Sequence, residues 1–161
     1  MKKVVIFRTL STIALIGCII FIFHNSLQPG VVSEVRSEET TGFLRKILGF
    51  LLSKFLEDDH YVRKLAHVIE FAIFGIVTMI NIKAYNVLIK IRYFLGLMLG
   101  LLIASIDETI QLFVPGRSGM VTDVIIDFSG FVLGFFICLM LLLWYNKSEC
   151  AKKHLRRNGN D

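Results

Sequence analysis

The chain has 161 residues, of which 55% are hydrophobic and 19% charged, and its formal net charge is +5 at pH 7. The mean hydropathy of +0.67 excludes an ordinary water-soluble enzyme and predicts an integral membrane protein. Much of the basic excess lies from residue 147 onward and accompanies no nucleic-acid recognition motif. We therefore expect no nucleic-acid partner and interpret the basic end as a cytoplasmic tail, residues 147–161, that contacts lipid headgroups.

Four apolar stretches approach the length of about 20 residues that a helix needs to cross a bilayer. In chain order they span about residues 4–23, 62–82, 91–114 and 121–145. The first stretch follows two lysines but lacks a small-residue cleavage site, so we expect an uncleaved helix that anchors and packs. The sequence thus predicts an all-α protein whose single membrane domain, residues 1–161, has four transmembrane helices.

The long connection between the first and second stretches has two parts. Residues 24–30 form a polar segment that is typical of a turn. Over residues 43–56 apolar side chains recur every three or four positions, while Arg45, Lys46 and Lys54 occupy the other side. This pattern predicts an amphipathic helix on the extracytoplasmic membrane surface, where it packs over the bundle or contacts lipid.

The lysines and arginines favour a cytoplasmic location for both ends of the chain. With the N-terminus inside, 11 of the 18 basic residues lie on the cytoplasmic side and 7 outside, and this bias sets the orientation of membrane proteins. The second and fourth helices then begin outside, and the third helix ends there. Three helices therefore bring their outer ends to the same membrane surface.

Ionisable residues occur at these outer ends, inside otherwise apolar helices. The polar set consists of Arg63, Lys64, His67, Glu70, Asp107, Glu108, Gln111, Arg117, Asp123 and Asp127. Because charge is costly in hydrocarbon, these side chains are expected to face one another at one depth. We predict that they form a ligand-binding polar pocket that opens to the exterior.

Helical spacing directs the polar set toward a common centre. Arg63, His67 and Glu70 follow an i, i+4, i+7 pattern, and Asp107 lies four residues before Gln111. Residues with these spacings share one face of a helix. The second and third helices are therefore expected to present their polar faces to the same pocket.

The fourth helix combines carboxylates with small residues on one face. Asp123, Asp127, Gly130 and Gly134 follow one another along it, and the glycines would let a neighbouring helix approach closely. Within the polar set, five carboxylates outnumber three basic side chains. An excess of buried negative charge requires protonation, a bound cation or water.

One interpretation of the polar set is a structural clasp. Ion pairs such as Arg63 with Asp123, or Lys64 with Asp107, would hold three helices in register. Buried pairs are weak evidence for stability, because desolvation can exceed the Coulombic gain. Under this interpretation the protein is a structural or partner-binding element, and a homo-oligomer is compatible with it.

A second interpretation is a binding site for a polar envelope ligand: a lipid headgroup, a lipid-linked cell-wall intermediate or a glycopeptide antibiotic. The planar guanidinium of Arg117 is suited to bidentate contact with phosphate or carboxylate. Gln111 and the carboxylates would then bind amines, amides or hydroxyls. The predicted amphipathic helix would recruit an amphiphilic ligand.

A third interpretation is an intramembrane enzyme. Candidate catalytic residues are His67, Glu70, Asp107, Glu108 and Asp127, as an acid/base pair or around a divalent cation. The His and Glu spacing is common by chance, so the sequence alone assigns no metal site and leaves the cation a possible cofactor.

The same residues resemble the VanZ-like family of bacterial membrane proteins. The matching motifs are Arg63-Lys64-x-Ala66-His67-x-x-Glu70-Phe71 with Gly75, Asp107-Glu108-x-x-Gln111-x-Phe113-x-Pro115-Gly116-Arg117-x-Gly119, Asp123-x-x-x-Asp127-x-x-Gly130 with Gly134, and Ser26-x-Gln28-Pro29. The resemblance implies a multi-pass protein of the bacterial cytoplasmic membrane. It also implies a role in the cell envelope or in antibiotic resistance of the teicoplanin type, because the founding member is associated with teicoplanin resistance.

Overall fold

The computed structural model describes the backbone of residues 2–33, 35, 59–85 and 89–158, and side chains in 2–33, 35, 63–85 and 91–148. Four long helices make up the bundle: α1 (Lys2–Ser26), α3 (Asp59–Ala84), α4 (Ile89–Gln111) and α5 (Val121–Asn158). Each contains a segment long and apolar enough to cross a membrane. This confirms the predicted all-α fold with four transmembrane helices. The amphipathic helix predicted at 43–56 lies outside the described residues.

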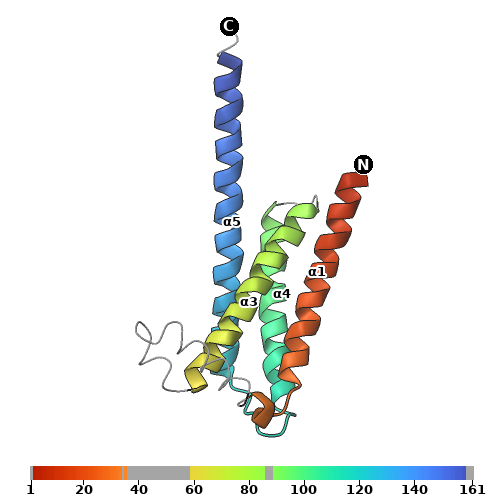
Figure 1. Ribbon diagram of the computed structural model, residues 1–161, viewed down its shortest axis with the longest axis vertical. Coiled ribbons are helices and arrows are strands. Elements are labelled where there is room, and N and C mark those ends of the chain that lie inside the picture. The colour runs from red at the N-terminus through yellow and green to blue at the C-terminus, as the bar shows by residue number, and fades with distance from the viewer. Residues whose placement is uncertain (1, 34, 36–58, 86–88, 159–161) are drawn as a thin grey trace.

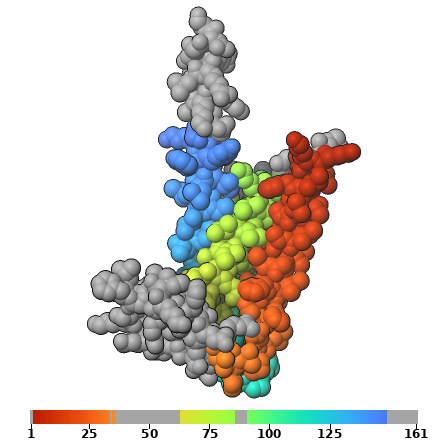
Figure 2. All heavy atoms as spheres, viewed as in Figure 1, coloured from red at the N-terminus to blue at the C-terminus, as the bar shows by residue number. Residues whose placement is uncertain are grey.

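The helices alternate in direction, as Figure 1 shows. Helix α1 begins at the end of the bundle where α5 finishes, and α1 and α4 end where α3 and α5 begin. Helix α3 lies between α5 and α1 (Figure 2) and makes its most extensive contact with α5. We call the end where α3 and α5 begin the polar end, because the three helices that carry the polar set begin or end there.

Close approach of α3 and α5 depends on glycine. A side chain at Gly130 would meet the backbone of Val68, and one at Gly134 would meet the carbonyl oxygen of Ala72. Gly75 lies in turn against the backbone of Phe131. The prediction that the glycines of α5 admit a neighbouring helix is confirmed, and that neighbour is α3. This contact fixes the residues that precede the glycines on both helices.

An aromatic core lies directly behind the polar residues of α3 and α5. Phe71, Phe74, Phe131 and Phe135 are at most 1% exposed. The ring centroids of Phe74 and Phe131 are 5.2 Å apart, and those of Phe131 and Phe135 are 5.8 Å apart. Aromatic rings at such distances pack favourably. The core therefore separates the polar end from the opposite half of the bundle.

Two helix ends differ from the prediction. Helix α1 continues to Ser26, so the first residues of the expected turn at 24–30 are helical. Helix α4 ends at Gln111 rather than at Val114. Proline lacks the N–H that a helix needs, and Gly116 has φ of 76°, so the chain turns at residues 112–116. A hydropathy profile does not detect this change in backbone geometry.

A second group of polar contacts joins α1 and α3 at the opposite end. The Nε of Arg8 donates a hydrogen bond to the carbonyl oxygen of Ala84 at 2.8 Å. The hydroxyl groups of Thr12 and Tyr85 are 2.8 Å apart, and the amide of Asn81 donates to the Thr12 hydroxyl at 3.0 Å. These contacts fix α1 against α3 far from the polar end.

Candidate functional site

A polar cavity of about 120 Å³ lies at the polar end of the bundle. Its walls are formed by Arg63, Lys64, His67, Glu108, Gln111, Gly116, Arg117, Ser118, Met120, Asp123, Ile126 and Asp127. Eight of the ten residues of the polar set are among them. The remaining two, Glu70 and Asp107, lie beside the cavity in contact with α1.

Helix α4 contributes a network of hydrogen bonds around one amide. The Nε2 of Gln111 donates to Oδ2 of Asp107 at 2.9 Å and to Oε1 of Glu108 at 3.0 Å. The Ser26 hydroxyl donates to Oδ1 of Asp107. The other Glu108 oxygen accepts a hydrogen bond from the backbone N–H of Met120 at 3.0 Å. One network thus joins the ends of α1 and α4 to the residue that precedes α5.

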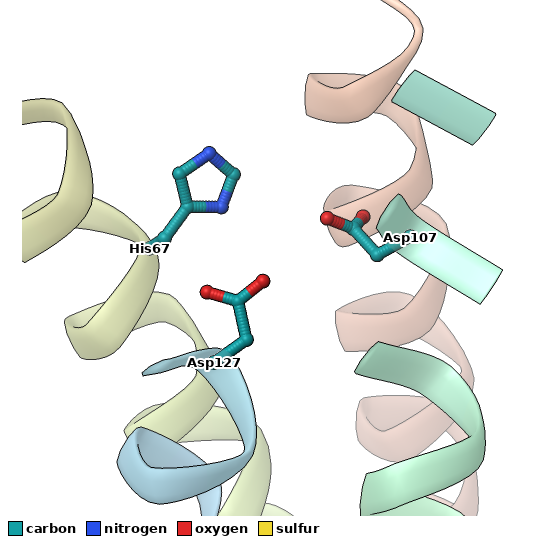
Figure 3. Close-up of side chains that lie close together, drawn as sticks. All are labelled: His67, Asp107 and Asp127. Atoms are coloured by element: carbon teal, nitrogen blue, oxygen red, sulfur yellow. The ribbon is translucent and has the colours of Figure 1, made fainter. Parts of the chain in front are cut away.

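Three residues from three helices converge on one point, as Figure 3 shows. His67 of α3, Asp107 of α4 and Asp127 of α5 each offer a nitrogen or oxygen atom within 4.8 Å of the others. We call these three residues the triad. Asp107 is fully buried and Asp127 is 2% exposed. The triad therefore holds two buried carboxylates beside a half-buried imidazole.

Two atoms of the triad have no hydrogen-bond partner among the described residues. They are Nδ1 of His67 and Oδ2 of Asp127, and both are buried. Buried polar atoms in native proteins are nearly always hydrogen-bonded to protein or to water. Because His67 and Asp127 both line the cavity, their unpartnered atoms indicate that a ligand, a water molecule or an ion completes this part of the site.

Glu70 lies on the α1 side of α3. Its Oε1 accepts a hydrogen bond from the side-chain amide of Asn25 at 3.1 Å. It also lines an apolar groove between α1 and α3 together with Cys18 and Ile73. The spacing predicted that Glu70 would share the cavity with Arg63 and His67. It faces α1 instead, because α1 extends one turn further than predicted and binds Glu70.

Arg117 projects from the loop between α4 and α5. Its Nη2 donates to the backbone carbonyl of Asn25 at 3.2 Å, while its buried Nε has no hydrogen-bond partner among the described residues. The loop is held in place by a hydrogen bond of 3.1 Å from the Gly30 N–H to the Pro115 carbonyl. Burial, and next the charge of Arg63, lower the pKa of Arg117, but an arginine stays protonated in proteins.

One salt bridge spans the mouth of the cavity. Nζ of Lys64 lies 2.8 Å from Oδ1 of Asp123, and the two side chains are 26% and 22% exposed. Of the two pairings expected for a clasp, Lys64 with Asp107 is wrong, because Lys64 pairs with Asp123, and Arg63 with Asp123 stays a prediction. Asp107 instead accepts hydrogen bonds from Ser26 and Gln111.

The partial exposure of this salt bridge leads to a small expected coupling energy. In a double-mutant cycle of Lys64→Met and Asp123→Asn, we expect at most about 1 kcal/mol, because water screens exposed ion pairs. Thermal unfolding of the four purified proteins in one detergent would measure it. A coupling of several kcal/mol would instead support the clasp interpretation.

Sequence reasoning missed the contribution of α1. Asn25 and Ser26 bind Glu70, Asp107 and Arg117, and Ser26 is fully buried. A neutral amide and a hydroxyl at the end of an apolar helix produce no charge or periodicity signal. The available signal was the Ser26-x-Gln28-Pro29 element of the family resemblance.

Comparison with known sequences identifies the family. The sequence model of the VanZ/LLP1 family matches residues 11–143. No curated protein and no solved structure matches the chain. The matched region includes every residue of the polar set and most of the four membrane-spanning segments. The chain therefore belongs to the VanZ/LLP1 family.

Proposed function

We propose that this VanZ/LLP1 protein binds a polar envelope ligand in the cavity at its polar end. The ligand carries a phosphate or carboxylate together with amine, amide or hydroxyl groups, as a lipid headgroup, a lipid-linked cell-wall intermediate or a glycopeptide does. The observation that carries the proposal is the set of buried atoms without partners among the described residues, on Arg117, His67 and Asp127. These atoms surround a cavity between membrane-spanning helices.

Arg117 is suited to the anionic part of such a ligand. Its Nη2 is held by the Asn25 carbonyl, whereas its Nε has no partner among the described residues. A guanidinium fixed at one nitrogen loses little further freedom when it binds an oxyanion through the others. Charge-assisted bonds of this kind are about twice as strong as neutral ones.

The opposite wall offers acceptors for the cationic or polar part. Asp123, Asp127 and Glu108 line the cavity, and carboxylates accept hydrogen bonds from amines, amides and hydroxyls. Basic and acidic groups thus line the same small volume. Such a distribution favours a ligand that carries both kinds of group over a simple anion or cation.

Exposed apolar side chains next to the Arg117 loop favour an amphiphilic ligand. Leu112 is 62% exposed, Phe113 82% and Val121 79%, and all three belong to or adjoin the loop that carries Arg117. Exposed apolar side chains next to transmembrane helices are suited to the boundary between headgroups and acyl chains. A ligand anchored in the bilayer would therefore reach the cavity along this surface.

The proposed location is the extracytoplasmic side of the bacterial cytoplasmic membrane, with both chain ends in the cytoplasm. The excess of lysine and arginine at the opposite end supports this orientation. The cavity then faces the compartment in which cell-wall intermediates and glycopeptides meet. A role in cell-envelope function or in glycopeptide resistance of the teicoplanin type follows as the physiological consequence.

A second candidate function is an acid/base or metal-dependent enzyme that acts on a lipid-linked substrate. The specific observation in its favour is the triad, in which an imidazole and two carboxylates lie within 4.8 Å of one another. Histidine and carboxylates gathered in this way are suited to proton transfer through a bridging water or to metal-assisted hydrolysis. Formation of a product from a lipid-linked substrate would distinguish this enzyme from a binding protein.

Neutralisation of buried carboxylates tests the proposed binding function. Glu70→Gln, Asp107→Asn and Asp127→Asn are each expected to abolish protection in a deletion strain exposed to a teicoplanin-type glycopeptide. The matched controls are Glu57→Gln, Asp58→Asn and Asp59→Asn, which change the same residue types in a charge run that precedes the polar set. Membrane levels of each variant would be measured in parallel.

The outcomes separate the three interpretations. Loss of protection at normal membrane levels supports the binding site. Loss of the protein itself from the membrane would favour the clasp and contradict the proposal. Equal tolerance at both sets, or a wild-type chain that gives no protection, would also contradict it.

A further inference from the structure

The triad provides the donor types that first-row divalent cations bind. Imidazole nitrogen and carboxylate oxygen together suit ions such as Zn²⁺, and three protein ligands with an open position are common at functional zinc sites. In the tetrahedral geometry usual for zinc, with bonds of about 2.1 Å, two ligand atoms lie about 3.4 Å apart. The donor atoms of His67, Asp107 and Asp127 lie within 4.8 Å of one another. Small side-chain rotations would bring them to bonding distance.

The hydrogen bonds around the triad leave its centre open. Asp107 is oriented from behind by Ser26 and Gln111, as the carboxylates of metal sites are commonly oriented by a second layer of hydrogen bonds. In contrast, Nδ1 of His67 and Oδ2 of Asp127 are buried without partners among the described residues. Asp127 is 98% buried, since its exposed fraction is 2%. Figure 3 shows its carboxylate pointing toward the imidazole of His67.

The net charge of the polar set also favours a bound cation. The polar set contains five carboxylates and three basic side chains, and Lys64 is already paired with Asp123. With every carboxylate ionised, two negative charges would be left over inside a membrane-spanning bundle, where uncompensated charge is costly. One divalent cation would cancel this excess.

We propose that His67, Asp107 and Asp127 bind one divalent cation of the Zn²⁺ class at the floor of the cavity. The open coordination positions face the cavity, where a phosphate or carboxylate oxygen of the ligand would bind the ion while Arg117 binds another oxygen. This inference deepens the proposed function and rests on it for the role of the ion, but metal binding itself is tested without any ligand.

The test measures zinc bound to the full-length protein purified in detergent. After treatment with a chelator, the protein is equilibrated with Zn²⁺ alone, passed through a desalting column and analysed for metal. We expect about one Zn²⁺ per chain for the wild type and at least a tenfold loss of affinity for Asp127→Asn. The matched control is Asp123→Asn, the same substitution one turn earlier on α5, which should retain the metal because Asp123 lies outside the triad.

A measurement on the unmodified chain keeps the inference testable where a variant fails to fold. Co²⁺ bound by one nitrogen and two oxygen ligands gives a visible absorption band, and one equivalent of Zn²⁺ should remove it. Wild-type protein that binds no more Zn²⁺ than Asp127→Asn, or that shows no Co²⁺ band, would overturn the inference. An equal loss of metal in Asp123→Asn would also overturn it, because the cavity would then attract cations without a defined site.

The two proposals fail in different ways. If the wild type binds no metal but Asp127→Asn still abolishes glycopeptide protection, the cation site is wrong and the ligand site stands. If the wild type binds zinc but every carboxylate variant protects the cell, the ligand site is wrong and the cation site stands.

Discussion

The Gly134→Ala protein is expected to be severely destabilised, although the substitution adds a single methyl group. The new Cβ would meet the carbonyl oxygen and the Cα of Ala72 on α3, and backbone atoms cannot move aside as a flexible side chain does. Overpacking of a helix contact typically costs 1 to 3 kcal/mol. We expect a loss of at least about 2 kcal/mol, because the α3–α5 contact is the most extensive in the bundle.

Gly17 of α1 supplies the matched control. A Cβ at this position meets nothing within 4 Å, and alanine favours helix more than glycine does. The Gly17→Ala protein is therefore expected to unfold at the wild-type temperature or slightly above it. Thermal unfolding in detergent and the monodisperse fraction in gel filtration would measure both variants. Equal unfolding temperatures for Gly134→Ala and the wild type would contradict the close approach of α3 and α5.

The destabilisation matters for function because the same contact positions the triad. His67 precedes Val68, whose backbone lies against Gly130, and Asp127 lies three residues before that glycine. If α3 and α5 separate, the imidazole and the carboxylate separate with them. The family motif therefore places on one face of α5 a carboxylate of the triad, Asp127, and the glycine that packs against α3, Gly130.

The elements that the sequence predicted well are those decided by composition over long windows. Four apolar segments of sufficient length specify four transmembrane helices, and the regular alternation of their directions brings the polar set to one end. Helical periodicity also placed Asp127, Gly130 and Gly134 on one face, and the structure shows that face against α3. These features depend on many residues each, so no single contact could overturn them.

The features that the sequence could not decide depend on single contacts. Arg63 and Lys64 are adjacent, and helix periodicity alone does not predict that Lys64 pairs with Asp123. Similarly, Phe113 and Val114 are apolar and extend the hydropathy of α4, but the turn at Pro115 and Gly116 removes both from the helix.

The largest omission concerns the end of α1. Hydropathy describes this helix as a uniform anchor, and only three of its residues, Ser11, Ile22 and Ser26, are buried. The buried ones matter because Ser26 donates to Asp107 and its neighbour Asn25 contacts both Glu70 and Arg117. The role of a neutral polar residue depends on its neighbours in the folded structure, and a local sequence pattern does not predict those neighbours.

Replacement of Arg117 by glutamine is expected to abolish protection against a teicoplanin-type glycopeptide while the protein stays in the membrane. The guanidinium lies in a loop outside the membrane-spanning segments and contributes one hydrogen bond to the Asn25 carbonyl. The loop retains its own bond between Gly30 and Pro115, so we expect folding to survive. Ligand binding should not survive, because the proposed anion contact is removed. We expect Arg117→Lys to recover little, since an ammonium group cannot form a bidentate contact.

Arg8 provides the control that makes this prediction specific. Like Arg117, it donates to a backbone carbonyl across helices, that of Ala84 at 2.8 Å, but at the opposite end of the bundle. Arg8→Gln should therefore lose about 1 kcal/mol of stability and still protect the deletion strain as the wild type does. Minimum inhibitory concentrations and membrane levels would be compared for Arg117→Gln, Arg117→Lys and Arg8→Gln. Full protection by Arg117→Gln would show that the cavity binds no anionic group through this residue, whereas equal loss in Arg8→Gln would indicate that any weakening of the bundle abolishes function.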